Sequence, residues 1–305
     1  MPSSPPFLNY RAGVAVGSTF YMPFINESSF CYAYDLHSGV WSFHKLHLIE
    51  HDVIYPQVTC AAVLGKKIYL VCGRLLNSYT LSNGMIEIDT TNFNMRIVKD
   101  AKGVPPRPRH EHSIDAIGDR YLVLFGGLCY NSVGENDVFV YDQHENKWFI
   151  PPISGYIVFD DLHKLDCETW TWYKYDHPEK ERYLRHQTSE KETVNSPQED
   201  YVIPTYGDSP YDRFQAFMCS HGSKLIIFGG HSIREDDDDN EILCSYSVDE
   251  LCIFNTKRKV WSTTRAAIID RADEPVTVSD MSIAQFLIDS NGLRVFIIAG
   301  RKAPE

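Results

Sequence analysis

A six-residue spacing recurs along the chain and restricts its fold more than any other feature. In five places an Asp or Asn closes an apolar stretch, and a Trp or Met follows six positions later. The five pairs are Asp35 with Trp41, Asp89 with Met95, Asp142 with Trp148, Asp166 with Trp172, and Asn255 with Trp261. Asp35 and Asp89 are 54 residues apart, and Asp89 and Asp142 are 53 apart. This distance indicates a structural unit of about 50 residues that repeats along the chain.

Each unit is predicted to contain four short strands. Apolar runs at 121–125 and 225–228 end in the glycine pairs Gly126-Gly127 and Gly229-Gly230. Glycine at a strand end permits a positive φ or a close backbone approach. The Asp or Asn that closes the third strand can accept hydrogen bonds from its own turn. The Trp that opens the fourth strand is expected to pack on the neighbouring sheet as a large buried side chain.

With these residues the chain resembles the kelch family. The resemblance rests on the two glycine pairs, the Tyr-Asp pairs at 34–35 and 141–142, the spaced tryptophans, and the sequence PRPRHEHS at 106–113. It implies an all-β, kelch-type β-propeller of about five to six four-stranded blades, in a single domain spanning 1–305. The expected blades cover 11–46, 58–99, 109–152, 153–176, 205–263 and 278–305.

Two departures from the repeat modify this expectation. Asp142 and Asp166 are only 24 residues apart, so blade four is predicted to be degenerate, with two or three strands. The polar and aperiodic segment 179–200 is predicted to be a flexible insertion. The sequence reaches Glu305 before a third strand of the last blade. That blade is therefore predicted to be incomplete, in a fragment of a longer chain or in an imperfectly closed ring.

Composition and charge exclude several classes of protein. Hydrophobic residues make up 43% and charged residues 23% of the chain, which is ordinary globular usage. The net charge of −12 repels phosphate, so nucleic acid is not an expected partner. No apolar run approaches the roughly 20 residues that span a bilayer, and the first residues do not resemble a signal peptide. We expect no membrane insertion and a cytoplasmic protein.

No sequence pattern supports catalysis or a cofactor. The chain lacks GxSxG, a Walker glycine loop and GxGxxG. His110-Glu111-His112 is expected to place two imidazoles on one face of a strand, but no third metal ligand is identifiable. The eight cysteines include no CxxC pair, and we expect them to be reduced and mostly buried. The prediction is a protein that is not an enzyme and holds no metal or other cofactor.

The resemblance also implies a partner-binding face, built from the loops after strand two and the loops between blades. In this sequence the first class of loop carries the candidate residues Arg74, Tyr130, Asn131, His231 and Arg234, and the second carries Arg107, Arg109 and Arg213. Arginine and aromatic residues on loops of a rigid scaffold are typical of binding hot spots. Because a guanidinium suits bidentate recognition of a carboxylate, we expect a protein ligand with acidic and apolar groups.

Some of these candidate residues could have a structural role instead of a binding role. Arg109 and Arg213 belong to the repeat pattern, and such arginines can satisfy backbone carbonyls instead of binding a ligand. The acidic run at 235–241 is expected to be a solvated loop, with docking of a basic partner or a divalent cation as the alternative.

The function implied by the resemblance is a non-catalytic protein-protein interaction module. It would act as a scaffold or adaptor and form part of a longer signalling or cell-polarity protein, with another protein or a peptide segment as partner. One alternative is a substrate-recognition subunit of a cullin-type ubiquitin ligase. The other, from a different class, is a metal-dependent kelch enzyme. The sequence does not indicate an oligomeric state.

Overall fold

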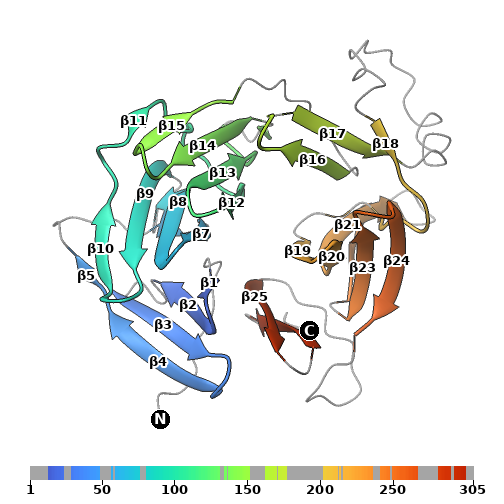
Figure 1. Ribbon diagram of the computed structural model, residues 1–305, viewed down its shortest axis with the longest axis horizontal. Coiled ribbons are helices and arrows are strands. Elements are labelled where there is room, and N and C mark those ends of the chain that lie inside the picture. Colours follow the sequence, from blue (N-terminus) through green and yellow to red (C-terminus); the bar gives the residue numbers. More distant parts are fainter. Residues whose placement is uncertain are drawn as a thin grey trace. The chain divides into compact units, whose positions relative to one another are not determined.

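The computed structural model shows an all-β chain in which the described residues form strands β1 to β26 and no helix (Figure 1). The described residues are 13–23, 29–48, 56–57, 59–75, 80–130, 134–135, 137–151, 162–169, 171–176, 202–211, 213, 216–235, 241–247, 249–266, 281–289 and 292–299. They belong to two compact units, Met1–Ile157 with Ser279–Glu305, and Val158–Val278.

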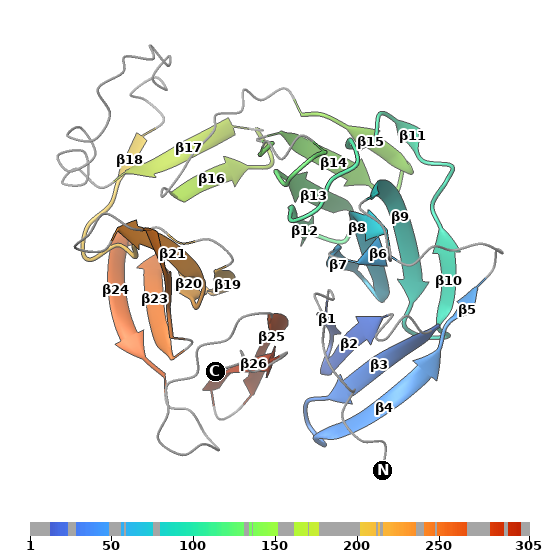
Figure 2. The ribbon, with the colours of Figure 1, turned by 180° about the vertical axis from the view of Figure 1, so that it is seen from behind.

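The first unit contains three antiparallel sheets that follow the repeat. Blade one consists of β1 (Val14–Val16), β2 (Thr19–Pro23), β3 (Phe30–Asp35) and β4 (Val40–Lys45). Blade two contains β7 (Cys60–Leu64), β8 (Lys67–Leu75), β9 (Leu81–Asp89) and β10 (Asn94–Ile97), and β6 (Pro56–Gln57) pairs with the end of β8. Blade three contains β12 (Ser113–Ile117), β13 (Tyr121–Phe125), β14 (Val138–Asp142) and β15 (Lys147–Phe149). A two-stranded remainder, β25 (Met281–Asp289) and β26 (Gly292–Ala299), lies beside β1 (Figures 1 and 2).

The second unit contains blades four and five. Blade four consists of β16 (Leu162–Asp166), β17 (Thr171–Asp176) and β18 (Val202–Pro204). Blade five consists of β19 (Phe217–His221), β20 (Lys224–Phe228), β23 (Glu250–Asn255) and β24 (Val260–Arg265). A separate hairpin of β21 (His231–Glu235) and β22 (Glu241–Ser245) is inserted between strands two and three of blade five. The described residues of blade four form only β16 and β17 with β18 along the outer edge, and 152–161, on which its predicted degeneracy depends, and 179–200 lie outside the described residues.

Short parallel strands cover the outer edges of several blades. β5 (His47–Leu48) pairs with β10, β11 (Lys102–Gly103) with β15, and β18 with β17 (Figure 2). In blade five, Tyr206 makes the corresponding parallel bridge to Val260 of β24. Gly103 has a φ of 79°, and a Cβ there would lie 2.0 Å from the carbonyl oxygen of Trp148. These segments protect outer strands that would otherwise expose unpaired N–H and C=O groups.

The predicted Asp or Asn turns are confirmed in all five repeats. In each, the side-chain Oδ1 accepts hydrogen bonds from backbone N–H groups two or three residues later. The pairs are Asp35 with His37 and Ser38, Asp89 with Thr91, Asp142 with His144 and Glu145, Asp166 with Glu168 and Thr169, and Asn255 with Lys257 and Arg258. The residue four after the Asp or Asn has a positive φ in four repeats, at Gly39, Phe93, Asn146 and Lys259. The sequence pattern did not predict that left-handed position, because only Gly39 is a glycine.

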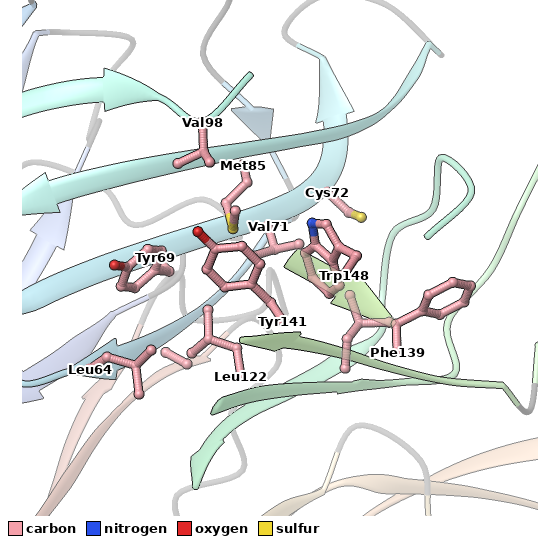
Figure 3. Packing of buried hydrophobic residues seen from close by; sticks show 12 residues of the cluster. Leu64, Tyr69, Val71, Cys72, Met85, Val98, Leu122, Phe139, Tyr141 and Trp148 are labelled. Atoms are coloured by element: carbon pink, nitrogen blue, oxygen red, sulfur yellow. The ribbon is translucent and has the colours of Figure 1, made fainter. Parts of the chain in front are cut away.

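The repeat aromatic residues form the contacts between neighbouring blades. Trp148 is 4% exposed and belongs to a cluster that includes Val71 and Met85 of blade two. Figure 3 shows Tyr141 and Trp148 beside these two side chains. Trp261 is 6% exposed and packs with Phe254 and with Tyr175 of blade four. Trp41 is only half-buried, and the side chain of Trp172 lies outside the description.

Candidate functional site

Arg109 is the most deeply enclosed of the candidate binding residues whose side chains the structure describes. It has no exposed surface, and its guanidinium makes a bidentate ion pair with Asp137 at 2.5 and 2.9 Å. Its Nη1 also donates to the carbonyl of Gly126 at 2.8 Å, and its Nε donates to the carbonyl of Arg107 at 3.1 Å. A buried charge needs this full set of partners to offset its lost hydration. Arg109 therefore ties the loop before β12 to the glycine pair.

Arg213 repeats the same backbone contacts in the second unit. Its Nε donates to the carbonyl of Tyr211 and its Nη1 to the carbonyl of Gly229, both at 3.2 Å. Its guanidinium lies 4.0 Å from the ring centre of Tyr246, a cation–π distance. In both units the arginine links the carbonyl two residues earlier to the first glycine of the pair. These contacts favour the structural alternative for Arg109 and Arg213.

Arg107 has the opposite character. Its side chain is 69% exposed, and Nη2 donates to both carboxylate oxygens of Glu135 at 3.1 and 3.0 Å. Nε and Nη1 make no hydrogen bond to any residue that the structure describes. Glu135 was not predicted as a site residue because it is 28 positions from Arg107, and no local sequence pattern joins the two.

Tyr130 presents an aromatic ring that its own hydroxyl holds in place. The residue is 64% exposed, yet its hydroxyl accepts the N–H of Leu81 at 2.8 Å and donates to the carbonyl of Leu81 at 3.2 Å. Leu81 is the cross-strand partner of Arg74, at the place where β8 ends and β9 begins. The structure thus brings Tyr130 to the strand end that carries Arg74, although 49 residues separate Tyr130 from Leu81.

Backbone pairing joins these loops into one cluster. His110 and Leu128 exchange hydrogen bonds at 3.0 and 2.8 Å, and the N–H of Glu135 donates to the carbonyl of Gly127 at 2.8 Å. This pairing connects the segment that carries Arg107 to the segment that carries Tyr130. We name the surface of Arg74, Arg107 and Tyr130 the blade-two/three loop surface.

The remaining candidates are described less completely. His231 is half-buried, and its Nδ1 lies 2.9 Å from Oγ of Ser245 across the β21–β22 hairpin. Arg234 lies opposite Ile242 in that hairpin, but its side chain lies outside the description. Asn131 and the tip of the acidic run, 236–240, also lie outside the described residues. Glu235 and Glu241 are backbone partners at the end of the hairpin ladder.

The expectation that His110 and His112 share one face of a strand is wrong. β12 begins only at Ser113, and Glu111 between them has a φ of 55°, which breaks the alternation of an extended strand. His112 is buried, and burial, with Arg109 nearby, lowers its pKa to about 4. The described residues contain no group of three His, Cys, Asp or Glu side chains that could hold a metal ion.

Comparison with known proteins identifies the relatives of this chain. No protein-family model matches the sequence. The chain is 25% identical to kelch domain-containing protein 1 of Homo sapiens over 192 residues, which are 46% of each chain. It is 25% identical to host cell factor of Drosophila melanogaster over 244 residues, which are 70% of this chain and 14% of that protein. The chain is a homologue of kelch-repeat proteins.

Structural similarity agrees with this homology. The solved structure titled "Structure of YjhT" superposes with a TM-score of 0.65, covers 99% of this chain and 93% of its own, and is 12% identical. That likeness concerns the fold alone, and it confirms the predicted all-β, kelch-type β-propeller. The chain spans less than half the length of the two kelch-repeat relatives. The kelch-repeat homology fits a protein-interaction module. Among the described residues there is no helix long and apolar enough to cross a membrane.

Proposed function

We propose that the chain is a non-catalytic protein-binding module and that the blade-two/three loop surface is its main contact region. The observation that carries the proposal is the exposed ring of Tyr130, whose hydroxyl is fixed to both backbone groups of Leu81. A rigid aromatic side chain loses little conformational entropy on binding, so it suits a hot spot. The exposed Arg107 and the half-buried Arg74 supply positive charge beside it.

The proposed ligand is a protein segment with acidic and apolar groups. The unengaged Nε and Nη1 of Arg107 offer donors for a carboxylate, while Glu135 holds Nη2. A bidentate carboxylate needs Nη2 together with Nε or Nη1, so it competes with Glu135 for Nη2, and added salt weakens the interaction because Arg107 is exposed. Arg109 contributes as a positioning residue, since its Nε holds the carbonyl of Arg107.

The loops of blade five extend the proposal. His231 and Arg234 lie in β21 of the hairpin inserted after strand two, where the sequence predicted a loop, and Arg213 lies in the loop before strand one. We propose His231 and Arg234 as a second contact region within the second unit, with Arg213 as a positioning residue through its bond to the carbonyl of Gly229. We propose Asn131 of blade three as a further member of the blade-two/three loop surface. Their contribution is to be tested separately from that of Arg74, Arg107 and Tyr130.

We propose a scaffold or adaptor role for the module, in a cytoplasmic signalling or cell-polarity protein. The homology to kelch-repeat proteins supports a binding module, and the finer role rests on resemblance. A substrate-recognition subunit of a cullin-type ubiquitin ligase is the alternative role for the same surface.

Affinity capture from the native cell extract, followed by quantitative mass spectrometry, tests the proposal. The variant Arg74→Ala/Arg107→Ala/Tyr130→Ala should lose the specific partners of the wild type. The matched control Arg258→Ala/Arg265→Ala, which removes two exposed arginines of blade five, should retain them. Affinity for an acidic peptide from a captured partner should fall with added salt. Identical partner sets for the wild type and the triple variant, with folding intact, would refute this surface.

A further inference from the structure

The first unit contains a cavity where the inner strands of three blades come together. β7 lies between β1 and β12 (Figures 1 and 2), and residues in these strands and beside their ends line a cavity of about 400 Å³. Sites for small ligands typically have volumes of roughly 300–1,000 Å³. None of the described residues that line the cavity belongs to the blade-two/three loop surface. The cavity is therefore a separate feature of this unit.

Small side chains keep the cavity open. Five of the lining residues have no side-chain atom beyond Cβ, namely Gly13, Ala61, Ala62, Ala116 and Gly118. Among the described lining residues only Asp115 can carry a charge. The wall is therefore aliphatic with one carboxylate. Small-ligand sites have this composition, in which a mostly apolar wall binds the ligand and a few polar groups orient it.

The carboxylate of Asp115 lies at the cavity wall and has no cationic partner. Its Oδ1 accepts the N–H of Ala116 at 2.7 Å, and Ala116 itself lines the cavity. Asp115 is exposed, so its carboxylate can be reached from solvent. The structure shows no ion pair between Asp115 and any residue that it describes. Oδ2 is therefore available to a ligand.

Comparison of the repeats shows that the fold does not require an acid at this position. In the four blades whose first strand is described, a glycine with a φ between 55° and 60° follows that strand, at Gly17, Gly65, Gly118 and Gly222. The residue three positions before this glycine is Val14, Ala62, Asp115 or Cys219. Only blade three of these four has a charged side chain there. Asp115 is thus an exception within the repeat, and it occurs where the cavity is.

We propose that this cavity binds a primary ammonium group on an aliphatic stem. The ammonium pairs with the carboxylate of Asp115, and the stem lies against the alanines of β7 and β12. A guanidinium suits a carboxylate with both oxygens available, but Oδ1 of Asp115 is already held by Ala116. An ammonium is a compact charge that one oxygen can bind. The net charge of −12 favours the approach of a cation.

An ammonium ligand can come from two sources, a free amine or the lysine side chain of a partner protein. Both present the same chemistry to Asp115. Spermidine and Nα-acetyl-lysine amide, titrated in parallel, distinguish them. Tighter binding of spermidine assigns the site to a free amine, and tighter binding of the lysine derivative assigns it to a partner's lysine.

NMR titration of ¹⁵N-alanine-labelled protein with n-butylammonium tests the site itself. The ligand is charged at neutral pH, and it should cause saturable shifts of the amide signals of Ala61, Ala62 and Ala116. 1-Butanol has the same stem without the charge, so it should bind about tenfold more weakly or worse. No partner protein is needed, so the result is independent of the proposed loop surface.

Asp115→Ala is the decisive variant, because Ala is the residue of blade two at this position and the fold should accept it. Urea unfolding checks that stability is retained. The variant should weaken n-butylammonium binding about tenfold or more. The matched control Asp119→Ala removes an exposed acid of the next turn that does not line the cavity, and it should leave the affinity unchanged. The proposal is overturned by a wild type without saturable shifts, by unchanged affinity in Asp115→Ala, or by an equal loss in both variants.

Discussion

Replacing Trp148 by Ala should destabilise the first unit much more than the same change at Trp41. A fully buried Trp removes about 150–250 Å² from water, and at about 25 cal/mol per Å² this contributes roughly 4–6 kcal/mol. That value is an upper estimate, because the unfolded chain already buries part of this surface. The side chain is enclosed by Val71, Met85 and Tyr141, so the cavity can close only in part. We expect Trp148→Ala to cost about 3–5 kcal/mol.

Trp41→Ala is the matched control, because Trp41 occupies the same position of the repeat but is half-buried. It should cost about half as much, roughly 2 kcal/mol. Urea unfolding measures both losses of stability. It is followed by circular dichroism, because removing a Trp changes the fluorescence signal itself. The m-value shows whether the surface area exposed on unfolding is the same in the two variants. An equal or larger loss for Trp41→Ala would refute the argument that the preceding blade buries the repeat aromatic.

Three further predictions follow from particular contacts. Burial raises the pKa of Glu87, but hydrogen bonds from Arg96, Lys67 and Tyr69 outweigh it and bring the pKa down to about 2. Ionised Glu87 therefore stabilises the fold fully at a pH above about 4.5, the pKa of this carboxyl in the unfolded chain. This stabilisation is lost as the pH falls toward 2, the pKa in the folded protein. The stability of Glu87→Gln should not fall over this pH range when it is measured by acid titration. The same pH dependence of stability in Glu87→Gln and in the wild type would contradict this prediction. Gly103→Ala should lower the melting temperature more than Gly118→Ala, because both have positive φ but only Gly103 lies against a carbonyl. Arg109→Met should cost about 3–5 kcal/mol in urea unfolding, since it leaves Asp137 without its bidentate partner. A loss of stability below about 1 kcal/mol would mean that water or a neighbouring side chain replaces Arg109 as the partner of Asp137.

Part of the proposed binding surface could be predicted from the sequence and part could not. Arg74, Arg107 and Tyr130 were named from their loops, and the structure brings them into one loop cluster of the first unit. Glu135 and Leu81 were missed because they are 28 and 49 residues from their partners. A sequence spacing does not predict which loops come together when the strands pair. The contacts of Arg107 with Glu135 and of Tyr130 with Leu81 are therefore visible only in the folded structure.

The sequence alone determined the features that depend on neighbours within a few residues. The Asp and Asn turns form between a side chain and N–H groups two or three positions away, and the spacing to the Trp follows from the length of the hairpin. For that reason the repeat, the four antiparallel strands of a typical blade and the all-β fold could be predicted, whereas the inserted hairpin β21–β22 and the short outer strands could not. Tertiary structure decided what depends on which blade lies next. Trp148 and Trp41 occupy the same repeat position, but Trp148 packs against side chains of blade two and is 4% exposed, whereas Trp41 is half-buried. Burial is a property of the neighbouring sheet, and a local pattern holds no information about that sheet.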